Sequence, residues 1–142
     1  MKKLIIISLF VPFFGKAQFR IVNTATINLV ELRSDTWPIS LQRVTKESDT
    51  TYVLNFRTQE YTNAVIMKTL TFRNLEQLKY FQKGLSTLKT GSTGDVAEFK
   101  DYSIKRVDIK KEGVWYTLNY DGAVTNFQQS EADKMITAIN SL

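Results

Sequence analysis

The chain has 142 residues, a formal net charge of +5, and neither cysteine nor histidine. Without those two residue types it has no disulfide, no Ser-His or Cys-His nucleophile pair, and no thiolate or imidazole metal site. A carboxylate pair, a Ser-Lys dyad and an all-oxygen metal site are the arrangements left open. The composition therefore favours a protein that is not an enzyme and uses no cofactor.

Residues 1–18 have the order of a secretory signal peptide. Lys2 and Lys3 come first, an apolar run follows over residues 4–14, and small or polar residues close the segment. The run is shorter than the about 20 residues that a membrane-spanning helix needs, which disfavours the alternative of an N-terminal anchor. The segment resembles bacterial signal peptides of the general secretory route. We therefore expect cleavage just after Ala17 or Gln18 and a periplasmic or secreted protein without a membrane span.

Removal of this signal would leave residues 19–142 as a single α+β domain. Three of the 19 basic side chains lie in residues 1–18, so 16 remain against 14 acidic ones and the net charge falls to +2. That balance gives little electrostatic support for nucleic acid as a partner. The sequence does not identify the partner, which could be a protein or a small ligand, and it leaves a homodimer open.

The first half of the domain, residues 19–89, is predicted to be a series of strands followed by one helix. β-branched residues and period-two alternation predict extended segments at 19–32, 39–46, 51–58 and 64–72. We expect these segments to form an antiparallel meander, since short turn-rich connections separate them.

The clearest helix signal follows the last of these strands. Asn74 is a favourable N-cap residue and Gln77 stands three positions later, so the two side chains can satisfy free backbone N–H groups at the helix start. Apolar side chains then recur at helical spacing and predict one buried face, formed by Leu75, Leu78, Phe81, Leu85 and Leu88. We expect this face to pack on the sheet.

The second half, residues 95–142, repeats the pattern after a short joint rich in glycine, serine and threonine. Residues 96–110 predict one long bent strand or two short ones. Residues 114–120 and 123–127 predict a hairpin around the Asp121-Gly122 turn.

A final helix is predicted from Ser130, with Asp133 three positions on as its capping partner. Its inward-facing side chains are predicted to be Ala132, Met135, Ile136 and Ile139. Glu131 and Asp133 are expected to stabilise the start of this helix rather than to act in catalysis.

The fold class predicted from both halves is α+β, an antiparallel β-meander followed by a helix, repeated twice. At an offset of 57 residues the apolar positions coincide: Leu70 with Phe127, Leu75 with Ala132, Leu78 with Met135, and Leu85 with Leu142. Either a duplication or coincidence explains the match, because this unit is built from local connections. The order of elements is similar to that of Whirly-type single-strand nucleic-acid binders. The chain has none of their motifs, and export disfavours their function.

Ser86 and Lys89 have the spacing of a Ser-Lys dyad but stand near the end of a helix. A Ser-x-x-Lys motif places its serine at a helix start, so we interpret these two residues as surface residues. The basic run Lys100, Lys105, Arg106, Lys110 and Lys111 predicts either a positive stripe on the sheet or an edge strand guarded by charge.

Strand alternation predicts large apolar side chains on the sheet face opposite the helices. An open sheet face should be polar unless something covers it, so this excess indicates a partner surface or cover by the rest of the chain. The candidate interaction surface consists of Val53, Arg57, Val65, Met67, Trp115, Thr117 and Asn119.

These observations favour an exported, small, non-enzymatic binding or protein-interaction module that uses an open sheet face. A periplasmic inhibitor or immunity-type protein would use the same face to block an enzyme. A carboxylate-dependent hydrolase is the alternative from another class, because paired acids leave no readable spacing in one sequence.

Overall fold

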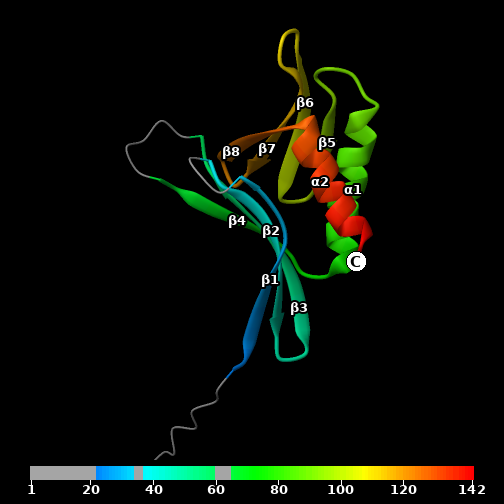
Figure 1. Ribbon diagram of the computed structural model, residues 1–142. Coiled ribbons are helices and arrows are strands. Elements are labelled where there is room, and N and C mark those ends of the chain that lie inside the picture. The colour runs from blue at the N-terminus through cyan, green and yellow to red at the C-terminus, as the bar shows by residue number, and fades with distance from the viewer. Residues whose placement is uncertain (1–21, 34–36, 60–64) are drawn as a thin grey trace, which may run out of the picture.

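The computed structural model describes residues 22–33, 37–59 and 65–142. Within these residues the chain forms two four-stranded antiparallel sheets, each followed by a helix (Figure 1). The predicted fold class, a meander-plus-helix unit repeated twice, is confirmed. The expected signal peptide, residues 1–18, lies outside the described residues.

Sheet A is formed by the first four strands, in chain order across the sheet. They are β1 (Thr24–Arg33), β2 (Ile39–Lys46), β3 (Asp49–Arg57) and β4 (Met67–Phe72). β2 and β3 pair without interruption from Ile39 opposite Phe56 to Lys46 opposite Asp49. β1 is irregular, because its register against β2 shifts after Asn28 and again after Glu31.

Sheet B is formed by the last four strands, again in chain order. They are β5 (Val96–Glu98), β6 (Tyr102–Ile109), β7 (Gly113–Tyr120) and β8 (Ala123–Gln128). The segment 96–110 is therefore two strands rather than one. Asp121 and Gly122 have positive φ angles of 50° and 70°, as a two-residue hairpin turn requires, and Tyr120 lies opposite Ala123.

Helix α1 (Leu75–Lys89) has the cap and the buried face expected from the sequence. Asn74 Oδ1 accepts a hydrogen bond from the Gln77 N–H at 2.9 Å, and Gln77 Oε1 accepts one from the Arg73 N–H at 2.8 Å. The buried residues of α1 are Leu78, Phe81, Leu85 and Leu88, while Leu75 is half-buried.

Helix α2 (Gln129–Asn140) begins earlier than predicted, so the assignment of Ser130 as its N-cap was wrong. Gln128 holds the N-cap position, and its backbone N–H donates to Glu131 Oε2 at 2.7 Å. The physical reason is that β8 ends at Gln128 and runs directly into the helix, which leaves no linker in which Ser130 could cap. The predicted inward positions Ala132, Met135 and Ile139 are buried, and Ile136 is half-buried.

The two helices lie side by side and each contacts strands of both sheets (Figure 1). α1 packs against β3 and β4 and also against β5 and β6, whereas α2 packs against β7 and β8 and also against β1. The side chains Gln82 and Asn140 are hydrogen-bonded at 2.5 Å across the two helices. Buried residues of both halves, including Phe56, Phe81 and Phe127, belong to one hydrophobic core.

The offset of 57 residues is wrong for the helices. α1 begins at Leu75 and α2 at Gln129, 54 residues later, and the buried residues Leu78, Phe81 and Leu85 match Ala132, Met135 and Ile139 at that same separation. Leu142, which the predicted offset aligned with buried Leu85, is 38% exposed. The difference arises because two residues separate β4 from α1, whereas β8 leads into α2 without a linker.

In the part of the chain that the structure describes, neither helix combines the length and the apolar character needed to cross a membrane.

Candidate binding surface

Four polar side chains form a hydrogen-bonded row across the outer face of sheet A, the face turned away from the helices. Thr69 Oγ1 donates to Asn55 Oδ1 at 2.7 Å, and Asn55 Nδ2 donates to Gln42 Oε1 at 3.0 Å. Gln42 Nε2 then donates to Asn28 Oδ1 at 2.7 Å. Each of the four strands contributes one member, and we call this row the amide ladder.

Strand alternation puts the ladder on the solvent side. Leu41, Leu54 and Leu70 are at most 3% exposed and point towards the helices, so their sequence neighbours Gln42, Asn55 and Thr69 point outwards. A side-chain amide has two N–H donors and an oxygen with two lone pairs, and Gln42 and Asn55 each use one donor and one lone pair within the ladder. The second N–H donor and the second lone pair of each of these two amides remain available to a ligand, and the hydrogen bonds of the ladder fix their positions.

The outer face of sheet A carries no net charge. Its charged side chains are Glu31, Lys46, Asp49 and Arg57, two acidic and two basic. Lys46 and Asp49 lie opposite each other beside the β2–β3 turn, and Arg57 is the last residue of β3. The centre of the face, where the ladder runs, is therefore neutral.

Three residues of the predicted surface share this face with the ladder. Val53 and Arg57 alternate with buried residues of β3, and Met67 lies opposite Arg57 and is 47% exposed. The Arg57 guanidinium lies over the Trp37 ring, 4.4 Å from its centroid. Val65 precedes β4 and is 62% exposed.

The other three predicted residues lie on the outer face of sheet B. Tyr116 and Leu118 are fully buried beneath the helices, so Trp115, Thr117 and Asn119 point the opposite way. Trp115 is half-buried between its cross-strand neighbours Val107 and Gln128. Its indole Nε1 is buried and finds no acceptor among the described residues. The predicted surface is thus divided between two sheets.

The two outer faces adjoin where the end of β3 meets β8. The Gln59 N–H donates to Val124 O at 2.8 Å, and Asn126 Nδ2 donates to Gln59 Oε1 at 2.8 Å. Asn126 lies opposite Thr117 on sheet B, whereas Gln59 follows Arg57 of sheet A by two residues. These two contacts join the two parts of the predicted surface.

An ion pair between Arg33 and Glu131 fixes this junction from the inner side. Arg33 Nε and Nη2 donate to the two carboxylate oxygens of Glu131 at 2.5 and 2.6 Å, and Nη2 also donates to Asn126 O at 3.1 Å. Burial alone would raise the pKa of Glu131, but the hydrogen bonds from Arg33 and from the Gln128 N–H outweigh it and hold that pKa below its usual range. Glu131 therefore stays ionised and ties β1 to α2.

The structure also contains a cavity that was not predicted from the sequence. A cavity of about 230 Å³ lies between β4, the first turns of α1 and the β5–β6 connection. Phe99 and Tyr102, which stack with ring centroids 4.3 Å apart, form one wall, and Tyr80 lines it from α1. Burial raises the pKa of the Tyr102 hydroxyl far above its ordinary value. The aromatic pair flanking Lys100-Asp101 was the available signal, but its position depends on how β5 pairs with β6.

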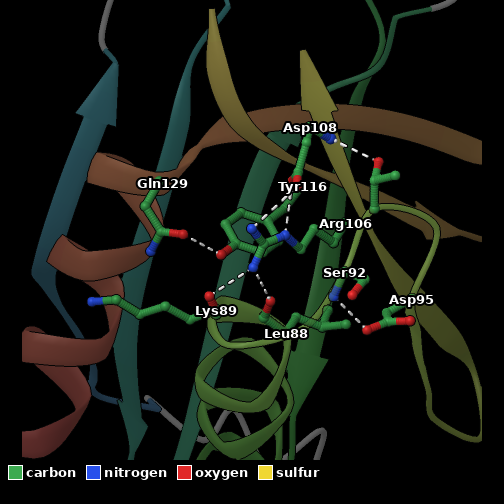
Figure 2. Close-up of polar contacts among 9 residues, drawn as sticks. Leu88, Lys89, Ser92, Asp95, Arg106, Asp108, Tyr116 and Gln129 are labelled. Atoms are coloured by element: carbon green, nitrogen blue, oxygen red, sulfur yellow. Dashed lines mark hydrogen bonds and ion pairs between the residues drawn. The ribbon is translucent and has the colours of Figure 1, made fainter. Parts of the chain in front are cut away.

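Arg106, one residue of the basic run, binds the end of α1 (Figure 2). Its Nη1 donates to the carbonyl oxygens of Leu88 and Lys89 at 2.9 and 2.7 Å, and its Nε donates to Asp108 at 2.8 Å. The guanidinium thus binds two carbonyl groups at the C-terminal end of α1, where Leu88 O also accepts a hydrogen bond from the Gly91 N–H at 3.1 Å. Figure 2 also shows the buried Tyr116, whose hydroxyl is hydrogen-bonded to Gln129.

The described residues contain no group of three or more acidic side chains that could hold a metal ion. Lys89 pairs with Asp133 at 2.7 Å rather than with Ser86, which is exposed on α1. No protein-family model matches this chain, and the comparisons found no curated protein and no solved structure similar to it.

Proposed function

We propose that the protein is an exported, non-enzymatic binding module and that the amide ladder of sheet A is its binding site. The observation that supports the proposal is the ladder itself, which consists of three side-chain amides and a hydroxyl on the outer face of the sheet. Each member donates a hydrogen bond to the next, from β4 to β1. Donors and acceptors fixed in this way lose little further conformational entropy when a ligand replaces their water.

The ligand class that this face fits is an uncharged, hydroxyl-rich chain, a neutral glycan strand. A sugar hydroxyl both donates and accepts, and so does a side-chain amide, so the two can form paired hydrogen bonds. The neutral centre of the face gives no attraction for a polyanion such as nucleic acid, which binds through neutralised phosphates.

Titration with defined oligosaccharides tests the site. The probes are uncharged hexasaccharides of β-1,4-linked N-acetylglucosamine and of β-1,4-linked glucose, with a sulfated heparin hexasaccharide as the charged comparison. We expect a neutral probe to shift the side-chain NH₂ signals of Asn28, Gln42 and Asn55 in ¹⁵N spectra. The Asn55→Ala variant should bind roughly fivefold more weakly, since a net hydrogen bond contributes about 1 kcal/mol.

The matched control is Asn140→Ala, which removes an exposed asparagine from α2, far from the ladder in sequence and on a different element. That variant should bind as the unaltered protein does. Preference for the heparin probe, or shifts that spare all three ladder amides, would contradict a neutral glycan site. Shifts of the ladder by an uncharged peptide but by neither sugar would replace the glycan with a protein partner.

The export part of the proposal is tested separately. N-terminal sequencing of the protein recovered outside the cytoplasm should give Gln18 or Phe19 as the first residue, because the charged, apolar and small residues follow in the order that signal peptidase recognises. Exported protein that still begins at Met1 would contradict it.

A further inference from the structure

The edge of sheet A formed by β1 differs from the other three sheet edges. An unpaired strand edge presents free backbone N–H and C=O groups, and proteins normally shorten, charge or cover it. β5 has only three residues, and β4 carries Lys68, whose ammonium pairs with Asp121. The β8 edge is covered, because Val124 O and Asn126 O accept hydrogen bonds from Gln59 and Arg33.

β1 shows none of these devices over its first half. It is ten residues long, and Thr24–Val30 contains no charged residue and no proline. Residues Thr24 to Asn28 are all exposed, and among the described residues only β2 pairs with them. This part of β1 extends past the ends of both helices, so neither helix blocks the approach of another strand (Figure 1).

The segment from Thr24 to Asn28 is also complementary to itself. In an antiparallel pair centred on Thr26, Thr24 lies opposite Asn28 of the second strand and Ala25 lies opposite Ile27. The outward row then pairs hydroxyls and amides, and the inward row pairs two apolar side chains. Ile27 is 46% exposed in the single chain, so this pairing would remove apolar surface from water.

The amide ladder ends at this edge with an unused donor. Asn28 accepts from Gln42 through Oδ1, but its Nδ2 makes no hydrogen bond within the described residues. In the pair centred on Thr26, that NH₂ group lies beside the Thr24 hydroxyl of the opposite strand, which can accept. The pairing would therefore continue the ladder from one chain to the other.

From these observations we infer that the protein forms a two-fold dimer in which β1 pairs antiparallel with β1 of a second copy, centred on Thr26. The two copies of sheet A become one continuous sheet of eight strands, and the two ladders lie on the same face. The inference concerns the strand edge and does not depend on which ligand the ladder binds. Pairing of two short strand segments buries less surface area than a standard protein interface. We therefore expect the dimer to dissociate on dilution into the micromolar range.

The absence of cysteine from the chain permits a register-specific test. In the Thr26→Cys variant the two thiols of the dimer face each other across the two-fold axis, within the 4.4–6.8 Å between Cα atoms that a disulfide requires. In the matched Thr24→Cys variant the thiols are about 13 Å apart, because four residues of strand separate them. We expect mild oxidation of the purified exported protein to give a disulfide-linked dimer for Thr26→Cys and none for Thr24→Cys.

Sedimentation velocity of the unaltered protein gives the second readout. We expect a concentration-dependent monomer–dimer equilibrium, which the Thr26→Lys variant shifts to monomer while its circular dichroism stays native. Equal cross-linking of the two cysteine variants would overturn the proposed register. If the unaltered protein stays monomeric up to about 1 mM, its dimer dissociation constant is too high for a specific pairing of this kind, and the dimer itself would be overturned.

Discussion

Sheet A and sheet B have the same strand order and each leads into a helix, but their outer faces differ. Sheet A presents the amide ladder, whose free donors and acceptors remain open to solvent. Sheet B holds the half-buried Trp115, and two of its outer polar atoms, Trp115 Nε1 and Asn126 Oδ1, are buried without a hydrogen-bond partner among the described residues. The same arrangement of four strands and a helix thus has an open polar outer face in the first half and a more enclosed outer face in the second.

The two sheets also differ in the length of their first strands, although they share both helices. The first three strands of sheet A have eight to ten residues and extend beyond the helices, whereas β5 has only three (Figure 1). Both helices pack on strands of both sheets, so neither half has a core of its own. The core is therefore common to both halves, and the outer faces are where the halves can differ.

The largest effect is expected from the shared core. Phe81 is fully buried on α1 and touches Phe72 of sheet A and Tyr102 of sheet B, with ring centroids 5.2 and 6.1 Å apart. Phe81→Ala should lower the free energy of unfolding by about 3–5 kcal/mol, because it leaves a cavity between the sheets. Denaturant titration should show one transition for both halves. An unchanged midpoint, or two separate transitions, would contradict a common core.

A smaller loss is expected on the outer face of sheet B. Trp115→Ala should lower the free energy of unfolding by about 2 kcal/mol, less than a fully buried tryptophan, since the side chain is half-buried. In a Trp37→Phe background, where Trp115 is the remaining tryptophan, we expect blue-shifted emission from the dilute monomer. Emission typical of exposed indole, with unchanged stability, would instead mark Trp115 as an open contact surface.

Acid should weaken the junction between the sheets. The pKa of Glu131 is lowered in the folded protein, so its ion pair with Arg33 contributes stability above the unfolded pKa of about 4.3, and this stability is lost as the pH falls through the folded value. Glu131→Gln should cost about 2 kcal/mol at pH 7, as expected for hydrogen bonds to a charged group. Between neutral and acid pH, the free energy of unfolding should fall less in the variant than in the unaltered protein. Identical pH profiles for both proteins would exclude this role.

The sequence predicted the elements well because their signals are local. The segment 39–46 has the bounds of β2, and the Asn74 cap and the apolar spacing of α1 are as expected. The direction of Trp115 also follows from alternation with Tyr116 within a single strand. The helix start at Gln129 was missed because a strand that runs directly into a helix leaves no separate capping residue.

The ladder and the junction could not be predicted, because they depend on register between strands. Asn28 reaches Gln42 only because the bulge in β1 comes after Asn28 and leaves these two residues opposite each other. Arg106 was grouped with its basic neighbours, although its partners are carbonyl groups at the end of α1. Alternation gives the face on which a side chain lies, but the neighbours on that face belong to the tertiary structure.

The measurement that tests the account most directly compares one substitution on the two outer faces. Asn55 belongs to the ladder of sheet A, and Asn119 is an exposed asparagine on the outer face of sheet B. Calorimetric titration with the neutral hexasaccharide that binds the unaltered protein should show that Asn55→Ala weakens binding roughly fivefold and Asn119→Ala leaves it unchanged. Weakening by Asn119→Ala alone would place binding on sheet B and contradict the assignment of function to the ladder.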